Sequence, residues 1–228
     1  MSYPSVPVPV PDLVTAISAG RDVAAVWVNE LGGMTFSIGP AGSAQGEFVK
    51  VHPDEHAAVL VAEAQRLTWA CRYLTVPRVI STGPGWLHTS GLPGRSAVDP
   101  HWVARPAVAA RAIGAGLRRM HDTLPVAGFP FGRPSWIPAD APPADRLVVC
   151  HGDACAPNTL IADDGTCAGH VDLGDLGVAD RWSDLAVATM SLAWNFPDDD
   201  GLEAALLDAY GVAPDPDRMA YFRERWEE

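Results

Sequence analysis

The sequence predicts an α+β protein with two lobes, an N-terminal antiparallel sheet with a helix and a C-terminal lobe that is mostly helical. Apolar residues alternate with polar or small ones over residues 23–51, which is typical of half-buried strands. After residue 106 the apolar residues recur at helical spacing instead. The stretch Gly91-Leu-Pro-Gly94 between these regions reads as a connector. We therefore expect one lobe over residues 1–91 and a second over residues 92–228.

In the first lobe, glycines punctuate the strands of 23–51 as turns, at Gly32–Gly33 and at 39–42. A helix is expected over about 55–72, because its apolar residues fall on one face: Leu60, Ala64, Leu67 and Cys71. Two further strands are expected at Val79–Ile80 and Trp86–Leu87. The first dozen residues should be extended, since they contain Pro4, Pro7, Pro9 and Pro11.

In the second lobe, residues 107–122 form a predicted core helix, and the proline-rich segment 125–145 is expected to be irregular. A short buried strand, Leu147–Val149, should follow. Next come two strands joined by a hairpin turn, and then three helices. The strands are expected at Thr159–Ala162 and Cys167–Val171, the turn at Asp163–Gly165, and the helices at about 182–194, 202–210 and 215–227, with Gly211 closing the second and Asp215 starting the third.

The composition excludes several classes of function. The chain has 228 residues, 16 basic and 28 acidic, so its formal net charge of −12 argues against nucleic-acid binding and favours a cationic small-molecule partner. No apolar stretch is long enough to span a membrane, and no secretory signal begins the chain. The four cysteines lack metal-binding spacing and are expected to be reduced thiols, which predicts a cytoplasmic protein.

The most specific motif is His151-Gly-Asp153-Ala-Cys-Ala-Pro-Asn158, followed by Asp172-Leu-Gly174 at the end of the hairpin. Phosphoryl transfer requires a carboxylate that orients the attacking hydroxyl group, together with oxygen ligands for Mg²⁺. Protein kinases supply these with an Asp and Asn at the same spacing and a later D-F-G. Asp153 is therefore the candidate base, and Asn158 and Asp172 are the candidate metal ligands. We expect His151 to brace the loop or to be a satisfied core histidine, rather than to take part in the chemistry.

A second pair of residues completes the pattern. Lys50 lies in a strand and Glu63 lies beside the apolar face of the following helix. A lysine that holds nucleotide phosphates and is steadied by a helix glutamate is the arrangement found in kinases. Alone, the two residues would be interpreted as an exposed lysine and a solvated glutamate. The Asp153 and Asp172 motifs downstream favour the phosphate-binding pair instead. Gly32–Phe36 could cover a nucleotide, although a plain hairpin turn explains it equally well.

Taken together, the stretches Leu147–Asn158, His170–Gly174 and Leu176–Ala188 resemble the bacterial aminoglycoside 3′-phosphotransferases, the kanamycin kinases. The resemblance extends over nearly the whole chain and is strongest over 146–190. It implies a protein-kinase-like fold, and a nucleotide, ATP or GTP, with Mg²⁺ as cofactors. It also implies transfer of the γ-phosphate to a hydroxyl of an aminoglycoside or a similar cationic small molecule.

The resemblance assigns roles residue by residue. Asp153 corresponds to the family's catalytic Asp, Asn158 and Asp172 to its Mg²⁺ ligands, and Lys50 and Glu63 to its phosphate-binding pair. Phe48 takes the place of an aromatic residue that stacks on adenine, and Ser90 to Leu92 take the place of the hinge whose backbone meets the base. Candidate carboxylates for the antibiotic are Asp175, Glu227 and Glu228, although a solvated acidic tail explains the last two equally well.

Two departures from the family concern the acceptor side. The relatives usually carry a longer, helix-containing segment where this chain has only residues 123–150, and some have a basic residue at the position of Asp175. Two hypotheses follow. The chain is an active small-molecule kinase, which its complete nucleotide motifs favour, or a nucleotide-binding sensor with a degraded acceptor site, which the shortened segment favours.

Overall fold

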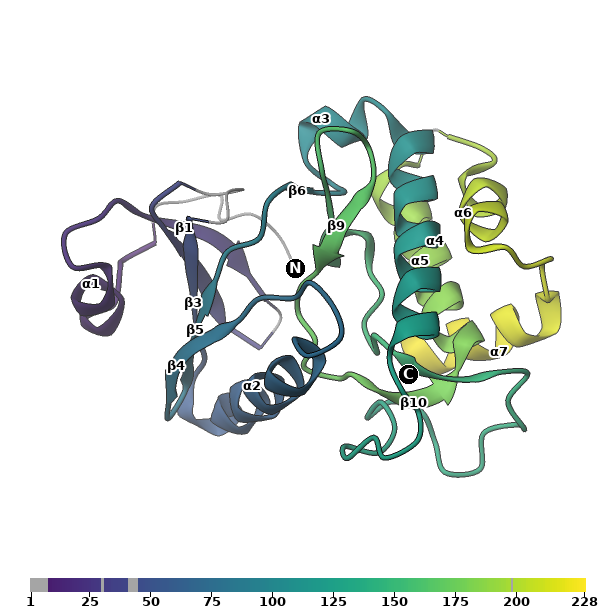
Figure 1. Ribbon diagram of the computed structural model, residues 1–228, viewed down its shortest axis with the longest axis horizontal. Helices are drawn as coiled ribbons and strands as arrows, with labels where there is room; N and C mark the ends of the chain where they lie inside the picture. Colours follow the sequence, from purple (N-terminus) through teal and green to yellow (C-terminus); the bar gives the residue numbers. More distant parts are fainter. Residues whose placement is uncertain (1–7, 30, 41–44, 198) are drawn as a thin grey trace. The chain divides into compact units, whose positions relative to one another are not determined.

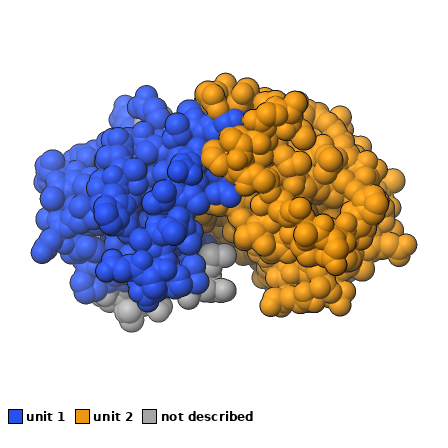
Figure 2. Space-filling model, turned by 90° about the horizontal axis from the view of Figure 1, so that it is seen from below, with its two compact units in different colours: residues 1–71, 76–93 blue, residues 72–75, 94–228 orange. Residues whose placement is uncertain are grey.

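The computed structural model describes residues 8–29, 31–40, 45–197 and 199–228. The chain divides into two compact units, coloured blue and orange in Figure 2. Unit 1 comprises Met1–Cys71 and Val76–Pro93, and unit 2 comprises Arg72–Thr75 and Gly94–Glu228.

Unit 1 is built on a five-stranded antiparallel sheet with the strand order β1-β2-β3-β5-β4. The sheet confirms the strands predicted in 23–51 and the two that follow. Gly32 and Gly33 lie in the turn between the first two strands, where the Asn29 carboxamide accepts from the Gly33 N–H. The strands are β1 (Val23–Val28), β2 (Met34–Ile38), β3 (Glu47–Val51), β4 (Val79–Gly83) and β5 (Trp86–Ser90).

Two helices belong to unit 1. The first, α1 (Asp12–Ser18), was not predicted, and it begins at the twelfth residue, which was expected to be extended. Residues 8–11 have no helix, as expected, and residues 1–7 lie outside the described chain. Val14 of α1 packs in a core with β2 and β3. The second, α2 (Ala57–Ala70), follows a short 3₁₀ turn, η1 (Asp54–His56), and confirms the predicted helix. The prediction was wrong for Cys71, which is exposed because the helix ends one residue before it.

Unit 2 contains two small antiparallel sheets. One has the order β6-β8-β9, with β6 (Arg95–Ser96), β8 (Thr159–Ile161) and β9 (Cys167–His170). The other pairs β7 (Leu147–Cys150) with β10 (Gly177–Asp180). Strands β6 and β10 are too short to give an alternating pattern and were not predicted. Leu147 was expected to be buried but is 58% exposed, because it begins β7 at the end of the ribbon, where β10 finishes.

Helices are the main secondary structure of unit 2 and supply much of its core (Figure 1). Helix α4 packs mainly on α6, and α5 packs on α7. Large side chains that are almost completely buried in this core include Trp102, Ile113, Trp182 and Tyr210. The helices are α3 (Pro100–Val103), the 3₁₀ turn η2 (Ala156–Asn158), α4 (Pro106–Thr123), α5 (Arg181–Asn195), α6 (Leu202–Tyr210) and α7 (Pro216–Glu227).

The end of α6 and the start of α7 agree with the sequence-based expectations. Gly211 follows α6 with a φ of 84°, a left-handed conformation that glycine adopts readily. Asp215 caps α7 by accepting from the Arg218 N–H.

Residues 125–145 contain neither helix nor strand, as predicted. All four cysteines are free thiols. Across the described residues, no helix combines the length and the apolar character needed to cross a bilayer.

Candidate active site

Lys50 and Glu63 meet in unit 1. Strand β3 alternates its faces, so Val49 enters the core with Val14 while Phe48 and Lys50 point to the opposite face. The Lys50 Nζ lies 2.7 Å from the Glu63 carboxylate. Glu63 is buried on α2, with only 4% of its side chain exposed, whereas the Lys50 side chain is 22% exposed. A buried carboxylate therefore fixes the ammonium group of a side chain that is still partly exposed, as a phosphate-binding lysine requires.

The candidate adenine-binding residues also lie in unit 1. Phe48 shares its sheet face with Lys50, two residues away along β3. Ser90 ends β5, and its backbone N–H and hydroxyl are both engaged with the backbone of Arg78. The Gly91 N–H donates to the Gly46 carbonyl. Two N–H groups of the predicted hinge are therefore already used. The N–H of Leu92, which is buried, is the candidate to meet a base.

Residues 151–153 follow β7 in unit 2 as a loop that is held by many hydrogen bonds. His151 is buried, and its Nε2 lies 3.0 Å from the Val171 carbonyl, which ties the loop to the residues just before Asp172. Its Nδ1 accepts from the Asp153 N–H at 3.3 Å. His151 is thus a brace, as expected. Gly152 has a φ of 86°, and a Cβ there would lie 2.1 Å from the Asp175 carbonyl oxygen, so only glycine fits.

The Asp153 carboxylate occupies an unusual position. Its Oδ1 is buried and has no hydrogen-bond partner among the described residues. Burial raises the pKa of Asp153 above its ordinary value, and the neighbouring charge of Asp172 raises it further, whereas a hydrogen bond with the Cys155 thiol lowers it. A buried carboxylate oxygen that lacks a donor is the acceptor that an incoming hydroxyl group would satisfy.

Asn158 and Asp172 offer the oxygen ligands that Mg²⁺ prefers. The Asn158 Nδ2 donates to the Asp153 carbonyl at 3.0 Å, so its carboxamide oxygen is the atom left for a cation. Asp172 has a φ of 63°, a left-handed conformation that is uncommon outside glycine and is often found at functional sites. The donor set and the charge of Asp172 beside Asp153 fit a magnesium ion.

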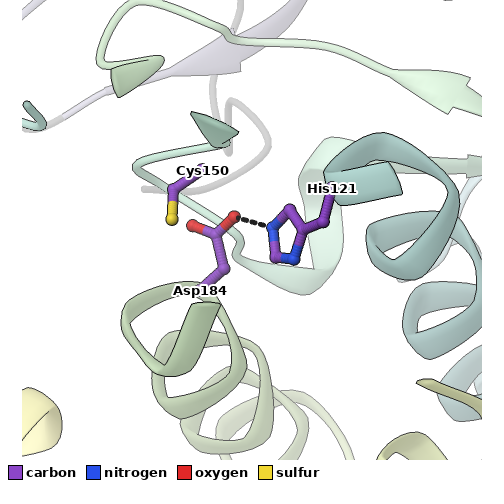
Figure 3. Close-up of side chains that lie close together, drawn as sticks. All are labelled: His121, Cys150 and Asp184. Carbon is purple, nitrogen blue, oxygen red and sulfur yellow. Dashed lines mark hydrogen bonds and ion pairs between the residues drawn. The ribbon is translucent and has the colours of Figure 1, made fainter. Parts of the chain in front are cut away.

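Asp184, in the first turn of α5, was missed by the sequence reasoning. It is completely buried and accepts from the backbone N–H groups of His151 and Gly152, at 2.6 and 3.0 Å. The His121 Nε2 donates to it at 2.9 Å, as Figure 3 shows. Burial alone would raise the pKa of Asp184, but the hydrogen bond and charge of His121 hold it below its ordinary value. An acidic residue in the first turn of a buried helix was the available signal.

His121, Cys150 and Asp184 lie close together, with candidate ligand atoms within 4.8 Å of one another (Figure 3). Hydrogen bonds already use these atoms. The His121 Nδ1 lies 2.9 Å from the Tyr210 hydroxyl, and the Ser183 hydroxyl donates to the Cys150 sulfur. Burial raises the pKa of Cys150 well above its ordinary value, so it is a thiol and not a metal-binding thiolate. The cluster anchors the loop instead of binding a metal.

The candidate acceptor carboxylates all belong to unit 2. Both oxygens of Asp175 accept from the Ser135 N–H at 2.9 Å, and one also accepts from the Ser135 hydroxyl. Glu227 ends α7, and Glu228 follows it and pairs with Arg225. Trp226, next to Glu227, contacts Trp136, whose indole N–H donates to the Gly152 carbonyl. The end of α7 is therefore connected to the loop that carries Asp153.

A cavity of about 400 Å³ also opens in unit 2. Its walls come mainly from the proline-rich segment 125–145, from β10 and from Phe222 of α7. Most of the residues that line it are apolar, and Asp153, Asn158 and Asp172 are not among them. The buried Asp180 at its wall is occupied by the N–H of Asp145 and by Arg218.

Comparison with known proteins gives consistent results. A family model described as "Phosphotransferase enzyme family" matches residues 133–222, which include Asp153, Asn158 and Asp172. The streptomycin 3''-kinase of Streptomyces griseus is 30% identical, with 94% of this chain and 95% of the relative covered. The aminoglycoside 3'-phosphotransferase of Streptomyces fradiae is also 30% identical, with 75% and 80% covered.

Solved structures agree in fold. The crystal structure of an aminoglycoside 3'-phosphotransferase of type VIII is 26% identical and covers 95% of this chain and 97% of its own, with a TM-score of 0.77. A phosphotransferase from Streptomyces rimosus in complex with ADP and streptomycin is 25% identical over 95% and 98%, with a TM-score of 0.66. The chain therefore belongs to the phosphotransferase family that contains the aminoglycoside kinases, and it shares their protein-kinase-like fold.

Proposed function

We propose that the protein transfers the γ-phosphoryl group of ATP or GTP to a hydroxyl group of an aminoglycoside. The family membership supports the reaction class, since the relatives compared are kinases of streptomycin or of other aminoglycosides. Asp153, Asn158, Asp172, Lys50 and Glu63 supply the parts that such a transfer needs.

The observation that carries the proposal is the unpaired Oδ1 of Asp153 in the part of the chain that the structure describes. It is aligned by a loop whose backbone is held by Asp184 and His151. We propose that this oxygen accepts a hydrogen bond from the acceptor hydroxyl and takes its proton as the hydroxyl oxygen bonds to the γ-phosphorus. The bond between that phosphorus and the β–γ bridging oxygen breaks, and the nucleoside diphosphate leaves with the bridging oxygen. The raised pKa of Asp153 makes it a better proton acceptor at neutral pH.

The nucleotide would be held by residues of unit 1. We assign Lys50 to its α- and β-phosphates, with Glu63 fixing the ammonium group. Phe48 would stack on the base, and the backbone of Ser90–Leu92 would recognise its edge. Asn158 and Asp172 would hold Mg²⁺, which neutralises phosphate charge when bound.

The acceptor would be a polycation. The net charge of −12 attracts cations over a distance, and Asp175, Glu227 and Glu228 are the carboxylates assigned to its amino or guanidino groups. The alignment with the S. griseus enzyme runs over 265 positions against 228 residues in this chain, so that relative contains insertions that this chain lacks. We assign part of this difference to the short segment 123–150 on the acceptor side, and a smaller recognition surface there predicts a weaker acceptor complex.

The test is coupled ADP release with Mg-ATP or Mg-GTP against a panel containing streptomycin, kanamycin, neomycin and simple amino alcohols. We expect turnover with at least one aminoglycoside, and none when the nucleotide is given alone. Stabilisation by Mg-nucleotide without turnover on any member of the panel would contradict the proposal and favour the sensor hypothesis.

A further inference from the structure

Trp136 connects the proline-rich segment 125–145 to the loop that carries Asp153. The indole N–H of Trp136 donates to the Gly152 carbonyl at 2.7 Å. That carbonyl belongs to the peptide group whose nitrogen is the Asp153 N–H. Because a peptide group is planar, a hydrogen bond to its oxygen also fixes the orientation of the bond that enters Asp153.

The other side of the same loop is held independently. Asp184 accepts from the N–H groups of His151 and Gly152, so it fixes the two preceding peptide groups from within the core. The Asp153 N–H itself donates to His151. Trp136 therefore supplies the bond to the loop from the segment 125–145, complementing the bonds from the core.

The residues around Trp136 hold it in place. Its neighbour Ser135 donates its N–H and its hydroxyl to Asp175, and the Gly132 carbonyl accepts from the Val178 N–H of β10. A Cβ at Gly177 would lie 2.3 Å from the Pro134 nitrogen, so the two stretches of backbone are in close contact. The residues just before Trp136 are thus anchored to residues 175–178, which limits the freedom of the Trp136 indole to move.

The Trp136 ring also contacts the C-terminal helix. Its centroid lies 5.1 Å from that of Trp226 at an interplanar angle of 84°, and 6.3 Å from that of Phe222 at 90°. These are edge-to-face contacts, which are favourable for aromatic pairs. Glu227 and Glu228 follow Trp226 directly, so one side chain links the acidic chain end to the peptide group of Asp153.

We propose that Trp136 is a positioning residue for the reaction. Its N–H fixes the orientation of the peptide group that enters Asp153, and its ring fixes the position of the end of α7. The expected effect on the reaction rate rests on the proposed function, whereas the expected effect on the loop rests on the geometry alone. The N–H and the ring have separable effects, because Trp136→Phe removes the donor but keeps an aromatic ring, whereas Trp136→Ala removes both.

The experiment compares Trp136→Phe, Trp136→Ala and the control Trp194→Phe, which changes a 55% exposed tryptophan on α5. Rates are normalised to the nucleotide-binding stoichiometry. We expect Trp136→Phe to lower kcat about five-fold, with the KM for nucleotide unchanged, because one hydrogen bond contributes modestly to the geometry. Trp136→Ala should also raise the KM for the acceptor. Trp194→Phe should change neither parameter.

Hydrogen–deuterium exchange of the peptide that covers 151–158 gives a readout that does not depend on turnover. We expect its amides to exchange about five-fold faster in Trp136→Phe than in the wild type or Trp194→Phe. If the wild type phosphorylates no acceptor, the proposed function fails and the exchange comparison still decides the role of Trp136. Unchanged exchange together with a kcat within two-fold of the wild type would overturn the inference. The inference would also be overturned if activity fell only in proportion to the amount of protein that still binds nucleotide.

Discussion

Asp153 carries a cost to stability that its proposed role explains. A carboxylate that is buried near Asp172 and has one oxygen without a donor is less stable ionised than it would be in water. Active sites commonly contain groups of this kind, because substrate supplies the missing interaction.

This cost predicts a stabilising mutation. Since the folded-state pKa of Asp153 is raised, its contribution to stability is complete below the unfolded pKa and is lost as the pH rises through the folded pKa. In metal-free protein at pH 7, Asp153→Asn should therefore raise Tm by roughly 2–4 °C. The difference should shrink as the pH falls through the raised pKa of Asp153 toward the ordinary carboxyl value. Calorimetry from pH 4 to 8 tests this; an equal or lower Tm at pH 7 would show that the ionised carboxylate is not strained.

Asp172 gives a second prediction at this scale. If it binds Mg²⁺, Asp172→Ala should abolish the metal-dependent part of nucleotide stabilisation. For the wild type, Mg-ATP at 100 times its dissociation constant should add about 2.7 kcal/mol to the free energy of unfolding. A thermal-shift titration compares the two proteins, with Asp164→Ala in the hairpin turn as an exposed control. A shift of the same size in Asp172→Ala would remove this residue from the ligand set.

At the scale of elements, α4 and α5 anchor the loop of Asp153 through His121 and Asp184. The sequence predicts both helices from their apolar periodicity, but periodicity does not say which polar residue faces inward. Asp184 and His121 lie on different elements 63 positions apart, and their pairing arises only when the helices pack. This is why the loop motif was predicted and its support was missed.

His121→Ala should lower the free energy of unfolding by roughly 3 kcal/mol, because it leaves a buried carboxylate without one donor. The pKa of Asp184 is depressed in the folded protein, so its stabilisation is present above the unfolded pKa and is lost as the pH falls through the folded value. Removing His121 should shift this acid-side loss to higher pH. Urea unfolding between pH 3 and 7 tests both effects, with His101→Ala as control. Identical pH profiles for His121→Ala and the wild type would contradict the account.

The end of α7 is assigned to the acceptor. Removing Glu227 and Glu228 should raise the KM for a cationic acceptor several-fold, because each exposed ion pair contributes on the order of 0–1 kcal/mol. The KM for nucleotide should not change. Glu224→Gln, an exposed change on the same helix, serves as the control. If the truncation left the acceptor KM unaltered, the acidic tail would be a solvated chain end.

For the whole molecule, the α+β class and nearly all the longer elements were predicted from the sequence. The failures have local causes. Helix α1 follows prolines that also favour extended chain, β6 and β10 are too short to show alternation, and the burial of Leu147 and Cys71 depends on where an element ends. The contacts of Trp136 with Gly152 and Trp226 join segments distant in sequence, so no spacing rule could predict them.

The central claim is that Asp153 directs phosphoryl transfer to an acceptor hydroxyl. The most direct measurement is mass spectrometry of streptomycin and kanamycin after incubation with Mg-ATP and either wild type or Asp153→Asn, with nucleotide binding measured for both proteins. The account predicts a singly phosphorylated acceptor with the wild type, and formation ~10²–10⁴-fold slower with Asp153→Asn at equal nucleotide affinity. Phosphorylation by Asp153→Asn within a few-fold of the wild-type rate would contradict it.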